Sequence, residues 1–187
     1  MPIHSYAVLL AFTLLGIILG LLVATIRRKD IDLLGKPTID RFYFYSGKFS
    51  LFACWGLFIL KAILPTIGYI SVPRHIAWLG VGLLYLGCIL MVFSFYSLGD
   101  ALKVGLPDAT TKLKTSGIYR FSRNPLYLSI FLICLASCIY LPDLLNVTFA
   151  IYGMVIHHNI VKGEETFLAR RFGVDWENYA SRVHRYI

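Results

Sequence analysis

Long apolar blocks alternate with short polar segments along most of the chain. Five of these blocks have the length and composition of helices that cross a membrane, which takes about 20 apolar residues or slightly fewer. Only residues 142 and 143 separate the last two blocks, so we expect a tight antiparallel hairpin there. The predicted spans are residues 6–26, 46–64, 76–98, 126–141 and 144–161.

The composition excludes a soluble enzyme. Of the 187 residues, 58% are hydrophobic and 15% are charged, against about 45–50% and about 25% in soluble domains. The mean hydropathy is +0.71, too apolar for the interior of a sphere of this size and for a disordered chain. We therefore predict an all-α integral membrane protein with one domain over residues 1–187. Residues 1–97 would hold three spans, and residues 98–187 a loop, the hairpin and a tail.

The basic residues indicate orientation rather than nucleic-acid binding. The net charge is +8, and sixteen of the eighteen Lys and Arg residues lie in the first loop, the third loop and the tail, with Lys48 counted in the first group. The opposite side holds only Lys61 and Arg74. Cytoplasmic segments carry such an excess of positive charge. We expect the N-terminus outside, and the third loop, the tail and the active site on the cytoplasmic side.

The tail after residue 161 has a helical stripe of apolar residues. We expect an amphipathic segment that lies on the membrane or folds back onto the helices, with a bend at Gly173. The stripe consists of Leu168, Phe172, Trp176, Tyr179 and Val183.

A first polar cluster precedes the fourth span. Pro125 fits the first turn of a helix, and Asn124 before it is a natural N-cap. Free backbone donors at a helix start favour an anionic group. By itself, the cluster fits equally an interfacial anchor in which Arg123 contacts headgroup phosphates and Tyr127 lies in the aromatic belt.

A second polar cluster, Glu164 and Glu165, follows the fifth span directly. Alone it fits the solvated start of a helix, which acidic residues stabilise. The hairpin changes this interpretation, because it places the start of the fourth span beside the end of the fifth. Arg123, Asn124 and Tyr127 should therefore lie close to the two glutamates, and polar groups that converge at a membrane edge predict a site.

Metal binding is not expected. His157 and His158 lie about two turns before the glutamates, but a structural or catalytic zinc site needs at least three protein ligands. The remaining histidines are scattered along the chain. The four cysteines, which fall within apolar blocks, lack metal-ligand spacing. They are Cys54, Cys88, Cys134 and Cys138.

At these residues the chain resembles the integral-membrane methyltransferases related to isoprenylcysteine carboxyl methyltransferase and to phospholipid methyltransferases. The resemblance covers about residues 98–187. The pattern G-[IV]-Y-x-x-x-R-[HN]-P-x-Y matches Gly117, Ile118, Tyr119, Arg123, Asn124, Pro125 and Tyr127. The pattern E-E-x-x-L-x-x-x-F-G-x-x-[WY]-x-x-Y-x-x-x-V matches Glu164, Glu165, Leu168, Phe172, Gly173, Trp176, Tyr179 and Val183.

The resemblance implies S-adenosylmethionine as cofactor, in a pocket that the third loop and the tail close over the hairpin. It implies direct methyl transfer to a lipophilic acceptor that enters from the lipid. The cofactor-binding residues would be Thr111, Lys112, Leu113, Lys114, Tyr119, Asn124, Pro125, Leu126, Tyr127 and Glu164. Residues near the acceptor would be Arg123, His157, His158, Ile160 and Glu165; no catalytic base is assigned.

Two departures from the family pattern bear on chemistry. Asn124 stands where many relatives have histidine, and an amide cannot act as a general base. Ile160 stands where the isoprenylcysteine enzymes have an arginine that faces the substrate carboxylate. We therefore expect an acceptor route without a fixed positive charge. A lipid amine or another apolar nucleophile then becomes a better acceptor than an isoprenylcysteine.

Two other functions remain open at this point. Membrane sterol reductases, which use NADPH, end in a related hairpin, but they have about twice as many spans. A non-catalytic membrane protein could retain the same fold. The expected partners are the bilayer and a lipophilic acceptor, without nucleic acid or metal, and the oligomeric state is open.

Overall fold

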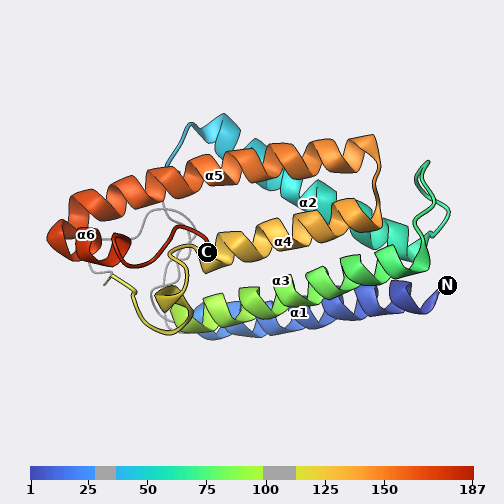
Figure 1. The fold of residues 1–187 in the computed structure, drawn as a ribbon, viewed down its shortest axis with the longest axis horizontal. Coiled ribbons are helices and arrows are strands. Elements are labelled where there is room, and N and C mark those ends of the chain that lie inside the picture. The colour runs from blue at the N-terminus through green and yellow to red at the C-terminus, as the bar shows by residue number, and fades with distance from the viewer. Residues whose placement is uncertain (28–36, 99–112) are drawn as a thin grey trace.

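The computed structural model describes residues 1–27, 37–98 and 113–187, and within these ranges the chain is helical, without β-strands. Figure 1 shows helices α1 to α5 side by side along the long axis, with α6 folded back at one end. The elements are α1 (Ile3–Arg27), α2 (Arg41–Ile63), α3 (Arg74–Leu98), the short 3₁₀ helix η2 (Gly117–Arg120), α4 (Pro125–Tyr140), α5 (Leu144–Phe172) and α6 (Val174–Ala180).

Four of these helices, α1, α2, α3 and α5, are long and apolar enough to cross a membrane. Helix α4 is apolar but has only 16 residues, or about 24 Å at 1.5 Å per residue, which is shorter than a hydrocarbon core of about 30 Å. The structure therefore agrees with four of the five predicted spans by length and composition.

The helices begin earlier than the apolar pattern predicted. Helices α1, α2 and α3 start two to five residues before the expected spans, because polar first turns are helical too. Asp40 caps α2 by accepting a hydrogen bond from the backbone N–H of Phe42 at 2.9 Å. Asp143 caps α5 in the same way through Leu145 at 3.0 Å. This second cap lies in the tight turn of the predicted α4–α5 hairpin.

The helices pack through small residues on facing sides. On α3, a Cβ at Gly80 would lie 3.2 Å from the Ala136 carbonyl oxygen, and one at Gly87 would lie 3.1 Å from that of Ser129. The missing side chains therefore let α3 and α4 approach closely, as small residues do between membrane helices. Large apolar side chains remain exposed on the outer faces, as expected for a surface in contact with lipid. Examples are Leu10, Leu21, Phe49, Phe52, Leu86, Ile89 and Phe93.

Helices α2 and α5 form a second close pair. A Cβ at Gly47 of α2 would overlap Ile156 of α5, and one at Gly153 would overlap Leu51. The Ser50 hydroxyl donates to the Phe149 carbonyl at 2.7 Å. These contacts fix the rotation of α2 about its axis and place its first half against the first half of α5.

The tail is more continuous with the hairpin than the sequence suggested. Helix α5 runs without a break past residue 161 to Phe172, so the first part of the predicted amphipathic tail forms the last turns of this helix. The predicted bend at Gly173 is confirmed: its φ of +51° lies in the region that glycine adopts without strain. Helix α6 then folds back, burying Trp176 and Tyr179, and the C-terminus reaches the start of α4 (Figure 1).

Candidate functional site

Two adjacent glutamates lie near the end of α5, beyond its apolar part. The first charged residue of α5 is Lys162, so Glu164 and Glu165 follow the 18-residue apolar stretch 144–161 rather than lying within it. Successive residues on an α-helix point about 100° apart. The two carboxylates therefore face different neighbours.

Glu165 is held by two arginines and an amide. Arg123 donates from Nε to Oε1 at 3.1 Å and from Nη2 to Oε2 at 3.3 Å. Arg185 donates from Nε and Nη2 to Oε2 at 2.9 and 2.7 Å, and Asn124 donates to Oε1 at 2.8 Å. Burial acts to raise the pKa of Glu165, but these donors and the two positive charges hold it below its usual value. The carboxylate is thus ionised and fully occupied.

Arg123 also ties the C-terminal segment to the bundle. Its Nη1 donates to the carbonyls of Ala180 and Val183 at 2.9 and 3.2 Å, and its guanidinium lies 5.6 Å from the centre of the Trp176 ring. Its backbone N–H donates to the His184 carbonyl at 3.0 Å. The sequence placed Arg123 near the acceptor, but most of its N–H groups form hydrogen bonds within the protein.

Asn124 occupies the predicted N-cap position of α4, but its side chain makes no capping hydrogen bond. The amide donates instead to Glu165 and to the Arg185 carbonyl at 3.2 Å. The expectation of a side-chain cap is wrong, because the Asn124 side chain is oriented by its Nδ2 donors toward Glu165 and the Arg185 carbonyl, and its Oδ1 accepts no backbone N–H of the first turn. Pro125 still occupies the first turn, as predicted.

Glu164 faces the inner side of the hairpin. The Tyr127 hydroxyl donates to its Oε1 at 2.7 Å, and the Tyr127 ring lies 6.1 Å from the His157 ring. Burial raises the pKa of Glu164 to about 7, although the Tyr127 hydrogen bond and the charge of Lys48 act in the opposite direction. Among the described residues, Tyr127 is the hydrogen-bond donor to this carboxyl group. Glu164 therefore retains acceptor capacity that Glu165 lacks.

Lys48 of α2 is the residue of this region that the sequence did not place there. Its ammonium lies 4.3 Å from the centre of the Phe44 ring, and its charge acts on both Glu164 and His157. Lys48 thus brings a positive charge to the α2 side of this region. The expectation of an acceptor route without a fixed positive charge stays a prediction. A single lysine within an apolar helix was the available signal, but the sequence alone counted it only as a marker of topology.

The two adjacent histidines of α5 contact different neighbours. Nδ1 of His157 donates to the Gly153 carbonyl at 2.8 Å, so the buried ring is held beside Tyr127. His158 is hydrogen-bonded to the Tyr186 hydroxyl at 2.8 Å. Within the described ranges, no three potential ligands gather as a metal site would require.

The remaining predicted cofactor residues lie around the start of α4. Tyr119 is buried, and its carbonyl accepts from the Tyr179 hydroxyl at 2.7 Å. Burial, together with the nearby Tyr179 and Glu164, raises the pKa of Tyr119 above its usual value. Leu113, Lys114 and Leu126 are half-buried. Thr111 and Lys112 lie outside the described residues.

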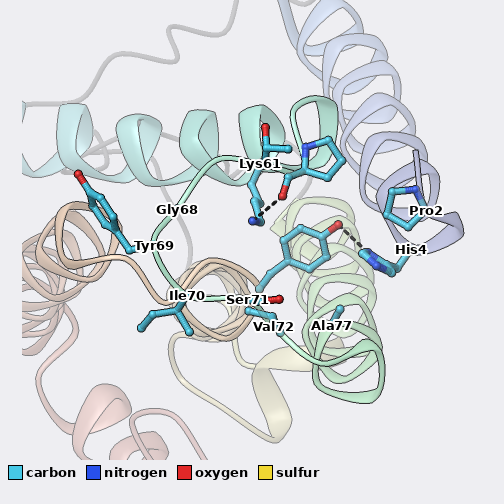
Figure 2. Close-up of a pocket in the computed structure, with 12 residues that line it drawn as sticks. Pro2, His4, Lys61, Gly68, Tyr69, Ile70, Ser71, Val72 and Ala77 are labelled. Atoms are coloured by element: carbon cyan, nitrogen blue, oxygen red, sulfur yellow. Dashed lines mark hydrogen bonds between the residues drawn. The ribbon is translucent and has the colours of Figure 1, made fainter.

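A cavity of about 410 Å³ lies at the opposite end of the bundle, away from the glutamates. Figure 2 shows a hydrogen bond between the His4 imidazole and the Tyr140 hydroxyl at one wall. It also shows the hydrogen bond that the Lys61 ammonium donates to the Pro65 carbonyl. The Lys61 ammonium donates to a second loop carbonyl, that of Ile67. These polar groups hold the α2–α3 connection, and none of the predicted cofactor residues lines this cavity.

The comparison with known families decides between the alternatives. The sequence model of the phospholipid methyltransferase family matches residues 75–175, more than half of the chain. The chain belongs to the phospholipid methyltransferase family. This confirms the resemblance found in the sequence and favours methyl transfer over the NADPH-dependent reductase. A comparison with curated proteins gives no match.

The region matched by the phospholipid methyltransferase family includes α3 from its second residue onward, which the two sequence patterns did not. It also contains Tyr127, His157, Glu164 and Glu165. Lys48 lies before it. The hairpin site is thus part of the family's common core, whereas the nearby positive charge comes from a segment outside the matched region.

Proposed function

We propose that the chain transfers a methyl group from S-adenosylmethionine to a nucleophile on a lipophilic acceptor at the cytoplasmic edge of the membrane. The observation that carries the proposal is the Tyr127–Glu164 pair. It places a carboxyl group with spare acceptor capacity at the end of the apolar hairpin, within the region matched by the phospholipid methyltransferase family.

The donor groups suit this cofactor. A carboxylate at Glu164 can bind an ammonium group or ribose hydroxyls. The first backbone N–H groups of α4, beside Pro125, can bind a carboxylate. When bound, the cofactor supplies a methyl group activated by a sulfonium. The part of the protein is to align donor and acceptor and to exclude water, which apolar walls such as Leu126 and Ile160 favour.

The acceptor most consistent with the site is a lipid that bears an amine or another neutral nucleophile. Ile160 is buried against Phe44 and Ile156, so it offers no charge to a substrate carboxylate. An amine acceptor must lose a proton, and Glu165 does not suit this task because its pKa is lowered and its oxygens are occupied. Glu164 and His157, the titratable groups beside Tyr127, are better placed.

The test of the function uses the purified protein in detergent–lipid micelles. Incubation with methyl-labelled S-adenosylmethionine and a total membrane-lipid extract should label the lipid fraction. A prenylcysteine analogue should be labelled poorly. Equilibrium binding should favour S-adenosylmethionine over NADPH. Binding of NADPH alone, or efficient labelling of the prenylcysteine with no labelled lipid, would contradict the proposal.

We also propose five spans, with the N-terminus outside. The short α4 would cross within a bilayer that thins around it. In Figure 1, α6 and the α2–α3 connection lie near opposite ends of the bundle. Asn178 belongs to α6, and Tyr69 belongs to the α2–α3 connection. On a background without the four cysteines, a membrane-impermeant thiol reagent should label Tyr69→Cys in intact cells. Labelling of Asn178→Cys instead would reverse the orientation.

A further inference from the structure

One face of α5 carries the groups that define the acceptor side of the site. His157, Ile160 and Glu164 follow each other at spacings of three and four residues, so they share this face. Helix α2 packs against it. Phe44 belongs to the same buried cluster as Ile160 and Ile156, with Tyr127 at its border.

Lys48 lies one turn after Phe44 on α2 and faces the same region. Its ammonium is 4.3 Å from the centre of the Phe44 ring. Its charge acts on His157 and on Glu164, the residues that bracket Ile160 along α5. A positive charge therefore lies across the α2–α5 contact from the position where the isoprenylcysteine enzymes have an arginine.

The Lys48 ammonium has donors to spare. Among the described residues, no side chain or carbonyl forms a hydrogen bond with it, and no carboxylate lies within 4 Å of it. A half-buried charge without a close partner is costly. It also lies about 10 Å from the start of α2 at 1.5 Å per residue, and a lysine side chain can reach headgroup depth from there. These features suit the binding of an anionic group that arrives with a lipid.

We propose that Lys48 forms an anion-binding subsite for the methyl acceptor, where it binds a phosphodiester oxygen of the lipid. The acceptor's anion then lies on the α2 side, and its nucleophile points toward the Tyr127–Glu164 pair. The subsite rests on the proposed function for its role in catalysis. The positive charge would then come from Lys48 on α2, instead of from an arginine at the position of Ile160 on α5.

The test compares Lys48→Gln with wild type on three acceptors in defined micelles: phosphatidylethanolamine, a long-chain primary amine without phosphate, and a prenylcysteine analogue. The variant should raise the KM for phosphatidylethanolamine by about tenfold or more, the scale of a lost charge-assisted hydrogen bond. The KM for the simple amine should change less than about twofold. Lys48→Arg should restore most of the loss.

Lys162→Gln is the matched control, because it removes the same charge from an exposed position at the same end of the bundle. It should leave all three KM values unchanged. A Lys48→Gln effect on phosphatidylethanolamine, without a matching effect on the simple amine or the prenylcysteine, identifies the phosphate as the bound group. Equal effects on the simple amine and the anionic acceptors would mean that Lys48 only positions Glu164, and would overturn the inference.

A binding measurement separates this inference from the proposed function. A fluorescent phosphatidylcholine analogue should bind the wild-type protein more tightly than Lys48→Gln, with no turnover required. Tight binding without methyl transfer to any acceptor would contradict the proposed function and support the subsite. Equal binding by wild type and variant would reject the subsite, whatever the activity.

Discussion

Glu164 and Glu165 are neighbours in the chain, yet their surroundings are opposite. Glu165 receives five hydrogen bonds from Arg123, Asn124 and Arg185, and both of its oxygens are occupied. Among the described residues, Glu164 receives one, from the Tyr127 hydroxyl. Glu165 ties the C-terminal segment to the hairpin, whereas Glu164 keeps acceptor positions that these residues leave unused.

This difference in hydrogen-bond partners suits Glu165 to a structural role and Glu164 to the ligand-binding role proposed above. A buried charge contributes little net stability when it is paired, but leaving its partners without it is costly. Where a buried carboxyl group has one partner and a raised pKa, its ionised form is disfavoured in the ligand-free protein. Binding of a cation then stabilises that ionised form more. Charge-neutral substitutions at the two positions should therefore have different consequences.

Glu165→Gln should produce the largest effect, a loss of about 3 kcal/mol in stability, because Arg123 keeps only 13% of its side chain exposed and would lose its charged partner. Thermal unfolding in detergent should show the loss. Limited proteolysis should cleave the chain after Gly173 more readily, since the C-terminal segment is held through Arg123 and Arg185. Unchanged stability would mean that the backbone contacts of the tail suffice without the carboxylate.

Glu164→Gln should weaken S-adenosylmethionine binding by about 1.5–3 kcal/mol, the scale of a hydrogen bond to a charged group. Its effect on stability should stay below about 1 kcal/mol, because an amide still accepts from Tyr127. Isothermal titration measures the first quantity and thermal unfolding the second. Glu177→Gln, at an exposed position of α6, is the control and should leave binding unchanged. Equal losses of affinity in both variants would mean that the glutamates act on cofactor binding only through their surface charge.

Much of this arrangement was predictable from hydrophobic pattern and chain connectivity. Apolar block length predicted the helices, and the two-residue connection forced the α4–α5 hairpin, so Tyr127 had to lie near the glutamates. Which glutamate contacts the two arginines and which contacts Tyr127 was not predictable. It depends on the rotation of α5 about its axis, which the packing of Gly153 against Leu51 of α2 fixes.

Two other features escaped the sequence because they depend on tertiary contacts. The continuation of α5 to Phe172 overrides the end of the apolar pattern at residue 161, since the polar turns pack against the returning tail. Arg185, which belongs to neither family pattern, completes the Glu165 cluster only because the bend at Gly173 returns the tail to α4. Lys48 likewise reaches the site only through the α2–α5 contact.

The pH dependence of cofactor binding should separate the two carboxylates again. Burial raises the pKa of Glu164 to about 7, so its negative charge is lost as the pH falls through neutrality, whereas Glu165, with its lowered pKa, stays ionised. From about pH 7.5 to about pH 6, wild-type affinity for S-adenosylmethionine should fall by up to roughly eightfold. The reason is that the ionised fraction of Glu164 falls about tenfold for each pH unit well below its pKa. The affinity of Glu164→Gln should be flat over this range, and a parallel fall in both proteins would assign the titration to another group.

Arg185→Lys should have the smallest effect and sharpen the structural side of the comparison. Hydrogen bonding to Glu165 raises the pKa of Arg185, but 37% of its side chain is exposed, and such partly exposed pairs contribute about 0.2–1 kcal/mol. Lysine keeps the charge but loses the two-pronged contact with Oε2, so stability should fall by about 0.5 kcal/mol. Arg182 donates from Nε to the Asn178 carbonyl on the surface, and Arg182→Lys should be neutral by the same thermal measurement. A loss as large as that of Glu165→Gln would mean that Arg185, rather than Arg123, is the main partner of the carboxylate.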